Sequence, residues 1–244
     1  EWKNTDSLPT TKITRAIPIT DTSFGTDKAF GMIADVSDGS NYTTEIDKEV
    51  VLYNTVNKMW ETTADHYWPG TNKTVNFYAY YPTGISTNIT HTVGSSPTLS
   101  YTVPDNVSDQ IDIMTATGNN VSGNTNSSTP LTFNHIFAAV KFAVGTSGLP
   151  SGTIKSITIN GIKNSGTYTF GSGWTLGSTT SSFTVSPSTT INGTSGENIA
   201  SDDFTLMMIP QIFTNADVSL VYNNGTTFST KISGTWNAGG VYTY

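Results

Sequence analysis

The chain has 244 residues, of which 35% are hydrophobic and only 12% are charged, with a net charge of −7 and no cysteine. The missing thiols exclude disulfides, thiolate zinc sites and cysteine nucleophiles, and the acidic balance argues against nucleic acid as a partner. No apolar run approaches the roughly 18 residues that a membrane-spanning helix needs. The abundance of Ser, Thr, Asn and Gly is typical of β-sheets with polar outer faces and many turns.

The first part of the chain, residues 1–23, is polar and predicts an N-terminal arm with one short extended stretch, TKITRAIPIT. Because the chain begins at Glu1 without a methionine, we expect processing upstream. Arg15, beside Ala16, is the only arginine in the chain, and an exposed arm is where a trypsin-like protease cuts most readily. From composition alone, however, chance is the better explanation of this position.

Two short strands are predicted next, at 30–35 and 49–55, with a turn at 38–41 between them. The stretch HYWPGTNKTVNFYAYYP, residues 66–82, then carries Trp68 and five other aromatic side chains after a Pro69-Gly70 turn. Its period-two pattern predicts a strand that ends at proline. One face of this strand carries Val75, Phe77, Ala79 and Tyr81, and the other carries Asn76, Tyr78 and Tyr80.

These aromatic residues permit two interpretations, a platform that stacks a ligand or a strand that enters a core. The strict alternation favours the core, because aromatic side chains pack well on a pleated surface. Tyr78 and Tyr80, on the second face, stay candidates for an interface.

The middle of the chain predicts a strand at 98–104 and either a strand or a turn of helix at 109–117. A long polar loop is predicted at 118–130. The segment 131–145, LTFNHIFAAVKFAVG, is the strongest candidate for a core strand, because it is apolar on both faces.

A linker is predicted at 146–152, and a run of short strands follows it. Asn224-Gly225 tolerates the positive φ angles of a tight hairpin turn. Regularly spaced strands with turn signals and little helix indicate an all-β sandwich fold. The predicted strands lie at 153–160, 166–171, 181–187, 203–210, 216–223, 226–233 and 240–244.

Catalytic and metal sites have little support in the sequence. His66, His91 and His135 lie far apart and match no zinc-binding spacing, and no G-x-S-x-G nucleophile motif occurs. The segment 35–41 resembles a calcium loop only weakly, since the glutamate twelve places on is absent. A glycosidase needs two carboxylates across a sugar, but aspartates beside turns are expected as turn formers. The candidate carboxylates are Asp105, Asp109, Asp112, Asp202 and Asp203.

Several segments, taken in order, give the chain a resemblance to a known family. They are TRA (14–16), FGMIAD (30–35), YWP with VNFYAYYP (67–82), QIDIMTA (110–116), LTFNHIFAAVKFAV (131–144) and GTWNAGGVYTY (234–244). In this order and spacing, the chain resembles the fimbrillin-like (Mfa-like) family, the type V pilus subunits of Bacteroidales bacteria.

The resemblance implies two tandem β-sandwich domains of transthyretin-like character. The expected divisions are an arm or first strand at 1–23, a first sandwich at 24–145, a linker at 146–152 and a second sandwich at 153–244. The resemblance also implies export as an outer-membrane lipoprotein, whose lipidated cysteine would lie upstream of Glu1. No cofactor and no metal are implied.

The resemblance further implies assembly by strand exchange, in which a surface protease cuts between Arg15 and Ala16. Loss of the strand formed by Thr11, Lys12, Ile13 and Thr14 would open a groove in the first sandwich. A neighbouring subunit would fill this groove head-to-tail, with Val241, Tyr242, Thr243 and Tyr244 as the visible part of the donor strand, although the chain ends where relatives usually continue. Ser7, in DSL (6–8), resembles an O-glycosylation site of these bacteria.

We therefore expect a structural fimbrial subunit, or an accessory or tip subunit, that contributes to adhesion and is not an enzyme. The first alternative is a monomeric surface lipoprotein that binds a host glycan or protein through loops such as 83–97 and 118–130. The second is a carbohydrate-active enzyme that uses the aspartates named above.

Overall fold

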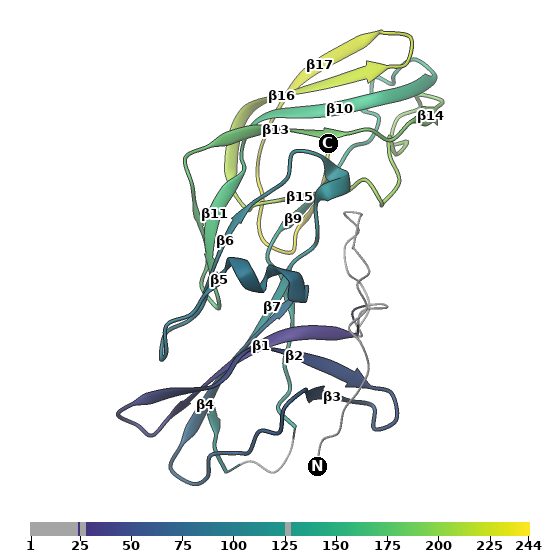
Figure 1. The fold of residues 1–244 in the computed structure, drawn as a ribbon. Helices are drawn as coiled ribbons and strands as arrows, with labels where there is room; N and C mark the ends of the chain where they lie inside the picture. The colour runs from purple at the N-terminus through teal and green to yellow at the C-terminus, as the bar shows by residue number, and fades with distance from the viewer. Residues whose placement is uncertain (1–23, 25–27, 125–127) are drawn as a thin grey trace.

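The computed structural model describes residues 24, 28–124 and 128–244, and these residues form an almost entirely β structure (Figure 1). The only helical segments among them are two short 3-10 helices, η1 (Thr83–Asn88) and η2 (Val107–Asp109). The all-β prediction is therefore confirmed. The residues predicted for processing and glycosylation lie outside the described residues; these are Ser7, Thr11, Lys12, Ile13, Thr14, Arg15 and Ala16.

A six-stranded antiparallel sheet occupies one end of the molecule, in the order β3-β2-β1-β4-β7-β8 (Figure 1). β1 and β4 lie at its centre, which agrees with their apolar sequences AFGMIADVS and TVNFYAYY. Its strands are β1 (Ala29–Ser37), β2 (Tyr42–Asn54), β3 (Met59–Thr62), β4 (Thr74–Tyr81), β7 (Met114–Ser122) and β8 (Asn134–His135).

Three further sheets form the rest of the fold. The largest has the order β13-β10-β16-β17, with β14 paired to β10; its strands are β10 (Gly152–Lys163), β13 (Thr180–Val185), β14 (Thr189–Ile191), β16 (Ile212–Tyr222) and β17 (Thr227–Thr235). The second contains β12 (Gly173–Leu176), β11 (Ser165–Thr169), β6 (Thr98–Thr102) and β5 (Ile89–Thr90). The third contains β15 (Leu206–Met208), β9 (Ala138–Lys141) and β18 (Val241–Thr243).

The aromatic strand β4 separates two hydrophobic cores. Val75, Ala79 and Tyr81 belong to a smaller core, while Tyr78 and Tyr80 belong to the larger one. The predicted alternation is therefore confirmed, and both faces of the strand are buried. Tyr78 and Tyr80, the candidates for an interface, are only 4% and 1% exposed and belong to the larger core instead. Burial, assisted by the negative charge of Asp47, raises the pKa of Tyr80 to about 12.

The sheets do not divide at the expected linker, residues 146–152. β6 pairs with β11, and β9 pairs with both β15 and β18, so strands from before the linker share sheets with strands from after it. The Trp174 indole also donates a hydrogen bond of 2.7 Å to the Ile136 carbonyl. The division of the chain into two sandwich domains stays a prediction, but hydrogen bonds and a common core cross the proposed boundary.

Two predicted segments take a different form in the structure. β7 runs on to Ser122, so the polar loop predicted at 118–130 begins as a strand. The strand predicted at 131–145 is split into β8 and β9, because the chain leaves the six-stranded sheet and enters the three-stranded one between them. Ile136 and Phe137 make this passage and are each 2% exposed. Burial on every side explains why this segment has apolar residues on both faces.

A glycine in β1 makes room for a tyrosine of the neighbouring strand. Gly31 lies opposite Tyr80, and a Cβ added at Gly31 would lie 2.1 Å from the ring atom Cζ of Tyr80. We expect Gly31→Ala to lower the free energy of unfolding by about 1–3 kcal/mol, because the buried ring has to move. Urea unfolding measures this effect. Gly84→Ala is the control, since its added methyl meets no atom within 4 Å; equal losses for both variants would contradict the prediction.

Candidate functional site: an apolar groove on the six-stranded sheet

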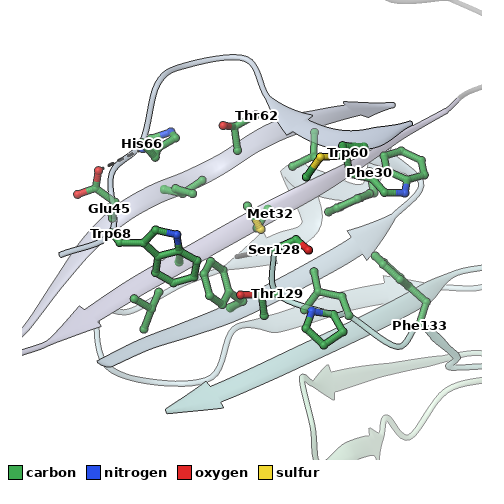
Figure 2. Close-up of a pocket in the computed structure, with 18 of the residues that line it drawn as sticks. Phe30, Met32, Glu45, Trp60, Thr62, His66, Trp68, Ser128, Thr129 and Phe133 are labelled. Carbon is green, nitrogen blue, oxygen red and sulfur yellow. Dashed lines mark hydrogen bonds and ion pairs between the residues drawn. The ribbon is translucent and has the colours of Figure 1, made fainter. Parts of the chain in front are cut away.

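A groove of about 920 Å³ lies on the outer face of the six-stranded sheet (Figure 2). Its floor consists of apolar side chains from the sheet strands, among them Met32, Ile46 and Phe77. Figure 2 shows His66 and Glu45 at one end of the groove and Phe30 and Trp60 at the other. Its charged lining residues, within the described part of the chain, are Glu45, Lys58 and His66, all on the rim.

The groove exists because this face of the sheet has no second sheet over it in the described structure. The buried residues of the smaller core all come from the six-stranded sheet, apart from Phe24. The other side chains that pack on this face are Trp68, Leu131 and Phe133, from two connecting segments. A sheet face of this kind is normally covered by another layer. Here two loop walls, 62–69 and 128–133, replace that layer and leave the space between them open.

The first wall, 62–69, is attached to β2 by two carboxylates. Glu49 accepts hydrogen bonds from the Thr63 hydroxyl at 2.8 Å and from the Ala64 N–H at 2.6 Å. The two ring nitrogens of His66 lie 2.6 Å from Glu49 Oε2 and 3.1 Å from Glu45 Oε1. Carboxylates only accept hydrogen bonds, so both contacts are satisfied only when the imidazole carries two protons.

In this cluster, His66 and the two glutamates each favour the charged form of the other. Burial lowers the pKa of His66, but the hydrogen bonds and charges of Glu49 and Glu45 outweigh it, so the pKa lies above its ordinary value. Burial likewise raises the pKa of Glu49, but hydrogen bonds from Ala64, His66 and Thr63 hold it below its ordinary value. The cluster therefore favours the protonated form of His66 and the ionised form of Glu49.

The second wall, 128–133, resembles a strand without a partner. Thr129, Leu131 and Phe133 are half-buried and alternate with exposed residues, which is the period of an extended chain. The backbone of this segment makes no backbone hydrogen bond to any described residue. The buried hydroxyl oxygen of Thr129 also has no hydrogen-bond partner within the described structure. Such groups are normally paired, so this wall can accept hydrogen bonds from an occupant of the groove.

Aromatic rings close one end of the groove around Phe24. The ring of Phe24 stacks on Tyr81 at 4.6 Å and meets Phe133 edge-on at 4.8 Å, measured between ring centroids. Trp60 lies 5.7 Å away on a third side. Phe24 is 8% exposed and lines the groove.

Three of the five candidate carboxylates, Asp105, Asp112 and Asp202, contact separate side chains. Among the described residues, no group of three or more Asp, Glu or His side chains is arranged to hold a metal ion. Their contacts are with separate partners; Asp35 contacts His91, Asp105 contacts Ser181, Asp112 contacts His135 and Asp202 contacts Lys141. In the segment 35–41, Asp38 accepts hydrogen bonds from the backbone of Ser40 and Asn41, as expected of a turn residue.

A family model of fimbrillin-like proteins matches residues 14–244, which is nearly the whole chain. The chain belongs to the fimbrillin-like family. No curated protein matches this fimbrillin-like chain significantly in sequence. In the part of the chain that the structure describes, no helix has the length and apolar character to cross a membrane.

Solved structures share the fold of this fimbrillin-like chain. A protein assigned to cell adhesion from Bacteroides uniformis is 15% identical, with a TM-score of 0.55, over 88% of this chain and 84% of its own. A second one, from Bacteroides ovatus, is 16% identical, with a TM-score of 0.55, over 88% and 80%. A fimbrial protein from Bacteroides ovatus is 16% identical, with a TM-score of 0.45, over 96% and 44%. At these identities the likeness to the first two structures concerns the fold alone.

The C-terminal residues predicted as a donor strand are bound within the fimbrillin-like chain itself. Val241, Tyr242 and Thr243 form β18, which runs parallel to β9. The Tyr244 hydroxyl accepts a hydrogen bond of 3.1 Å from the Trp236 indole. A donor role requires β18 to leave β9, and it stays a prediction.

Sequence reasoning did not identify the groove, because its two walls are loops. Residues 128–130 were expected to be loop, and 131–133 the start of a core strand. The contacts of His66 with Glu45 and Glu49 join residues 21 and 17 positions apart, a separation that no local motif reveals. The signal that pointed there was the alternation of Phe77, Ala79 and Tyr81 in β4, which face the groove side of the sheet.

Proposed function

We propose that this chain is a structural subunit of a surface pilus, or an accessory or tip subunit of one, in which the groove binds an extended peptide segment. The observation that carries this proposal is an apolar groove beside a strand-like wall that makes no backbone-to-backbone hydrogen bond with any described residue. An added strand would cover the apolar floor of the groove and form backbone hydrogen bonds with 128–133.

The first occupant that we propose is the arm of the same chain. Phe24 lines the groove, and the sequence before it predicts an extended stretch with Thr11, Lys12, Ile13 and Thr14. An extended chain spans about 3.3 Å per residue, so the nine residues between Thr14 and Phe24 can span about 30 Å. Cleavage between Arg15 and Ala16 by a trypsin-like surface protease would then release this stretch.

The second occupant is a segment of a neighbouring subunit, in which Val241, Tyr242, Thr243 and Tyr244 take part. Because one end of each chain would fill the groove of the next, the contact is head-to-tail and repeats into an open filament. Export as an outer-membrane lipoprotein would hold the uncleaved subunit at the cell surface before assembly. Family membership supports this location and the association with other pilin subunits.

The experiment uses the chain's single arginine. An arginine-specific protease has one site in these 244 residues, Arg15, and Arg15→Gln removes it. We expect the cleaved chain to form ordered polymers in size-exclusion chromatography and negative-stain microscopy, while the Arg15→Gln variant stays monomeric. A cleaved chain that stays monomeric would contradict the proposal, and one that binds a host glycan as a monomer would favour the alternative of a binding module.

A further inference from the structure

The first wall of the groove has an unusual attachment. Residues 63–69 make no backbone-to-backbone hydrogen bond with any described residue. At the C-terminal side of this wall, the Gly70 N–H donates to the Gly123 carbonyl at 2.8 Å. Between this bond and the end of β3, one polar contact comes from β3, where the Thr62 hydroxyl donates to the Ala64 carbonyl at 2.8 Å. The other polar contacts to the sheet go to the Glu45 and Glu49 carboxylates of β2, and these are the contacts that reach His66.

We propose that 63–69 is a flap over the groove, whose part from His66 to Pro69 is held closed by protonated His66 and is released when His66 loses its proton. The inference rests on the proposed function only for its consequence, access of a peptide segment to the groove. The flap carries Tyr67, Trp68 and Pro69, which line the groove, and Trp68 meets Phe77 of the floor edge-on at 6.0 Å. Release of the flap would therefore widen the groove along its length.

The geometry determines the direction of the switch. A neutral imidazole has one N–H and one lone pair, so one of its nitrogens would point a lone pair at a carboxylate oxygen. That contact would be lost or repulsive, whichever nitrogen keeps the proton. Thr63 and Ala64 would still be held by Glu49, so the release concerns the part of the flap from His66 to Pro69.

The other charged groups near His66 do not change the conclusion that its proton holds the flap to Glu45 and Glu49. Glu45 and Glu49 come from β2, and Lys58, from the β2–β3 turn, lines the same groove. Asp65 is the neighbour of His66 in sequence and is exposed. The lining residues from β1, β4, β7 and the wall 128–133 are all uncharged. Within the described structure, the two glutamates are thus the charged partners of His66.

The sign of the pH effect follows from the raised pKa of His66. A raised pKa in the folded state means that the attachment is fully present below the ordinary value of about 6.5 and is lost as the pH rises through the higher, folded value. Above that value, the ratio of released to attached flap increases up to about tenfold per pH unit, because one proton is involved.

A spin label on the flap tests the proposal in the full-length, uncleaved chain. The chain has no cysteine, and Tyr67 is 81% exposed, so Tyr67→Cys provides a single nitroxide site. We expect an immobile label near pH 5.5 and a mobile one near pH 9. In the His66→Gln background the label should be mobile at both pH values. The control is His135→Gln, which removes another histidine paired with a carboxylate, Asp112, and should leave the pH dependence intact.

A second variant decides the question if His66→Gln does not fold. Glu45→Gln removes one partner of His66 and leaves Glu49 and its three contacts, so the release should shift to lower pH. Label mobility that does not change between pH 5.5 and 9, or a change that persists in His66→Gln, would overturn the proposal. These spectra report on the flap whether or not the subunits assemble. A flap that responds to pH as expected, in a chain that does not polymerise after cleavage, would contradict the proposed function and leave the flap proposal intact.

Discussion

Phe77→Asp should abolish polymerisation of the cleaved chain and leave the chain folded. Phe77 is half-buried in β4, packs against Trp68 and lines the floor of the groove. An apolar segment that enters the groove would remove water from a carboxylate at this position, and this costs free energy. The loss of one apolar contact alone costs about 1.5–3 kcal/mol, which corresponds to at least a tenfold weaker association. Light scattering after cleavage with the arginine-specific protease measures the polymerisation rate.

A matched variant separates this effect from a general loss of hydrophobicity. Phe228 is 39% exposed on β17, in a different sheet, and Phe228→Asp makes the same chemical change away from the groove. We expect it to polymerise like the parent chain. If both variants polymerise normally, the groove is not the contact between subunits. If both fail, the contact extends to β17.

Asp35→Ala should produce the largest loss of stability, about 3–5 kcal/mol. Asp35 is 1% exposed in β1 and lies 2.8 Å from His91 Nε2. It also accepts hydrogen bonds from the Thr44 hydroxyl at 2.8 Å and from the Gly94 N–H at 2.9 Å. Alanine would leave three donors without an acceptor, of which the His91 side chain is 6% exposed. Urea denaturation followed by tryptophan fluorescence measures the change in the free energy of unfolding.

An exposed aspartate is the control for this prediction. Asp217 contacts Lys231 at 2.6 Å, and both side chains are more than half exposed. Exposed ion pairs contribute little, because water and salt screen them. Asp217→Ala should therefore leave the unfolding midpoint almost unchanged. A similar effect of the two substitutions would show that Asp35 does not connect β1 to the loop that carries His91.

The local structure of the chain was predictable where burial imposes a strict period. β4 has period-two alternation because the residues on its two faces belong to different cores, with Tyr78 on one side and Val75 on the other. The hairpin at Gly225, whose φ is +88°, was also predictable, because glycine tolerates this angle without steric cost. The strand in the aromatic stretch fills two cores, as its alternation predicted, and it also contributes Phe77 to the groove.

The arrangement of strands was not predictable from local patterns. β6 is polar on its outer face and pairs with β11, about 65 residues further along the chain. Nothing in either sequence specifies the partner, because many Thr- and Ser-rich strands could form the same ladder. The short strands β3, β5, β12 and β14 also escaped prediction, since two to four residues are too few to show a period.

The groove was not predictable either, since it arises from the absence of a covering layer. Met32 and Phe77 have the same apolar character as residues of a closed core, and only the arrangement of the walls 62–69 and 128–133 shows that the space between them is open. Likewise, the contact between His66 and Glu49 depends on how the loop folds back over β2. The family resemblance, in contrast, depended on the order of several short segments and was confirmed over residues 14–244.

A cryo-EM structure of the polymer formed after cleavage at Arg15 would test the central claim most directly. We expect an extended segment of the neighbouring subunit in the groove, paired through its backbone with 128–133 and with side chains facing Met32 and Phe77. Subunits that contact each other through other surfaces, with the groove empty, would contradict the account.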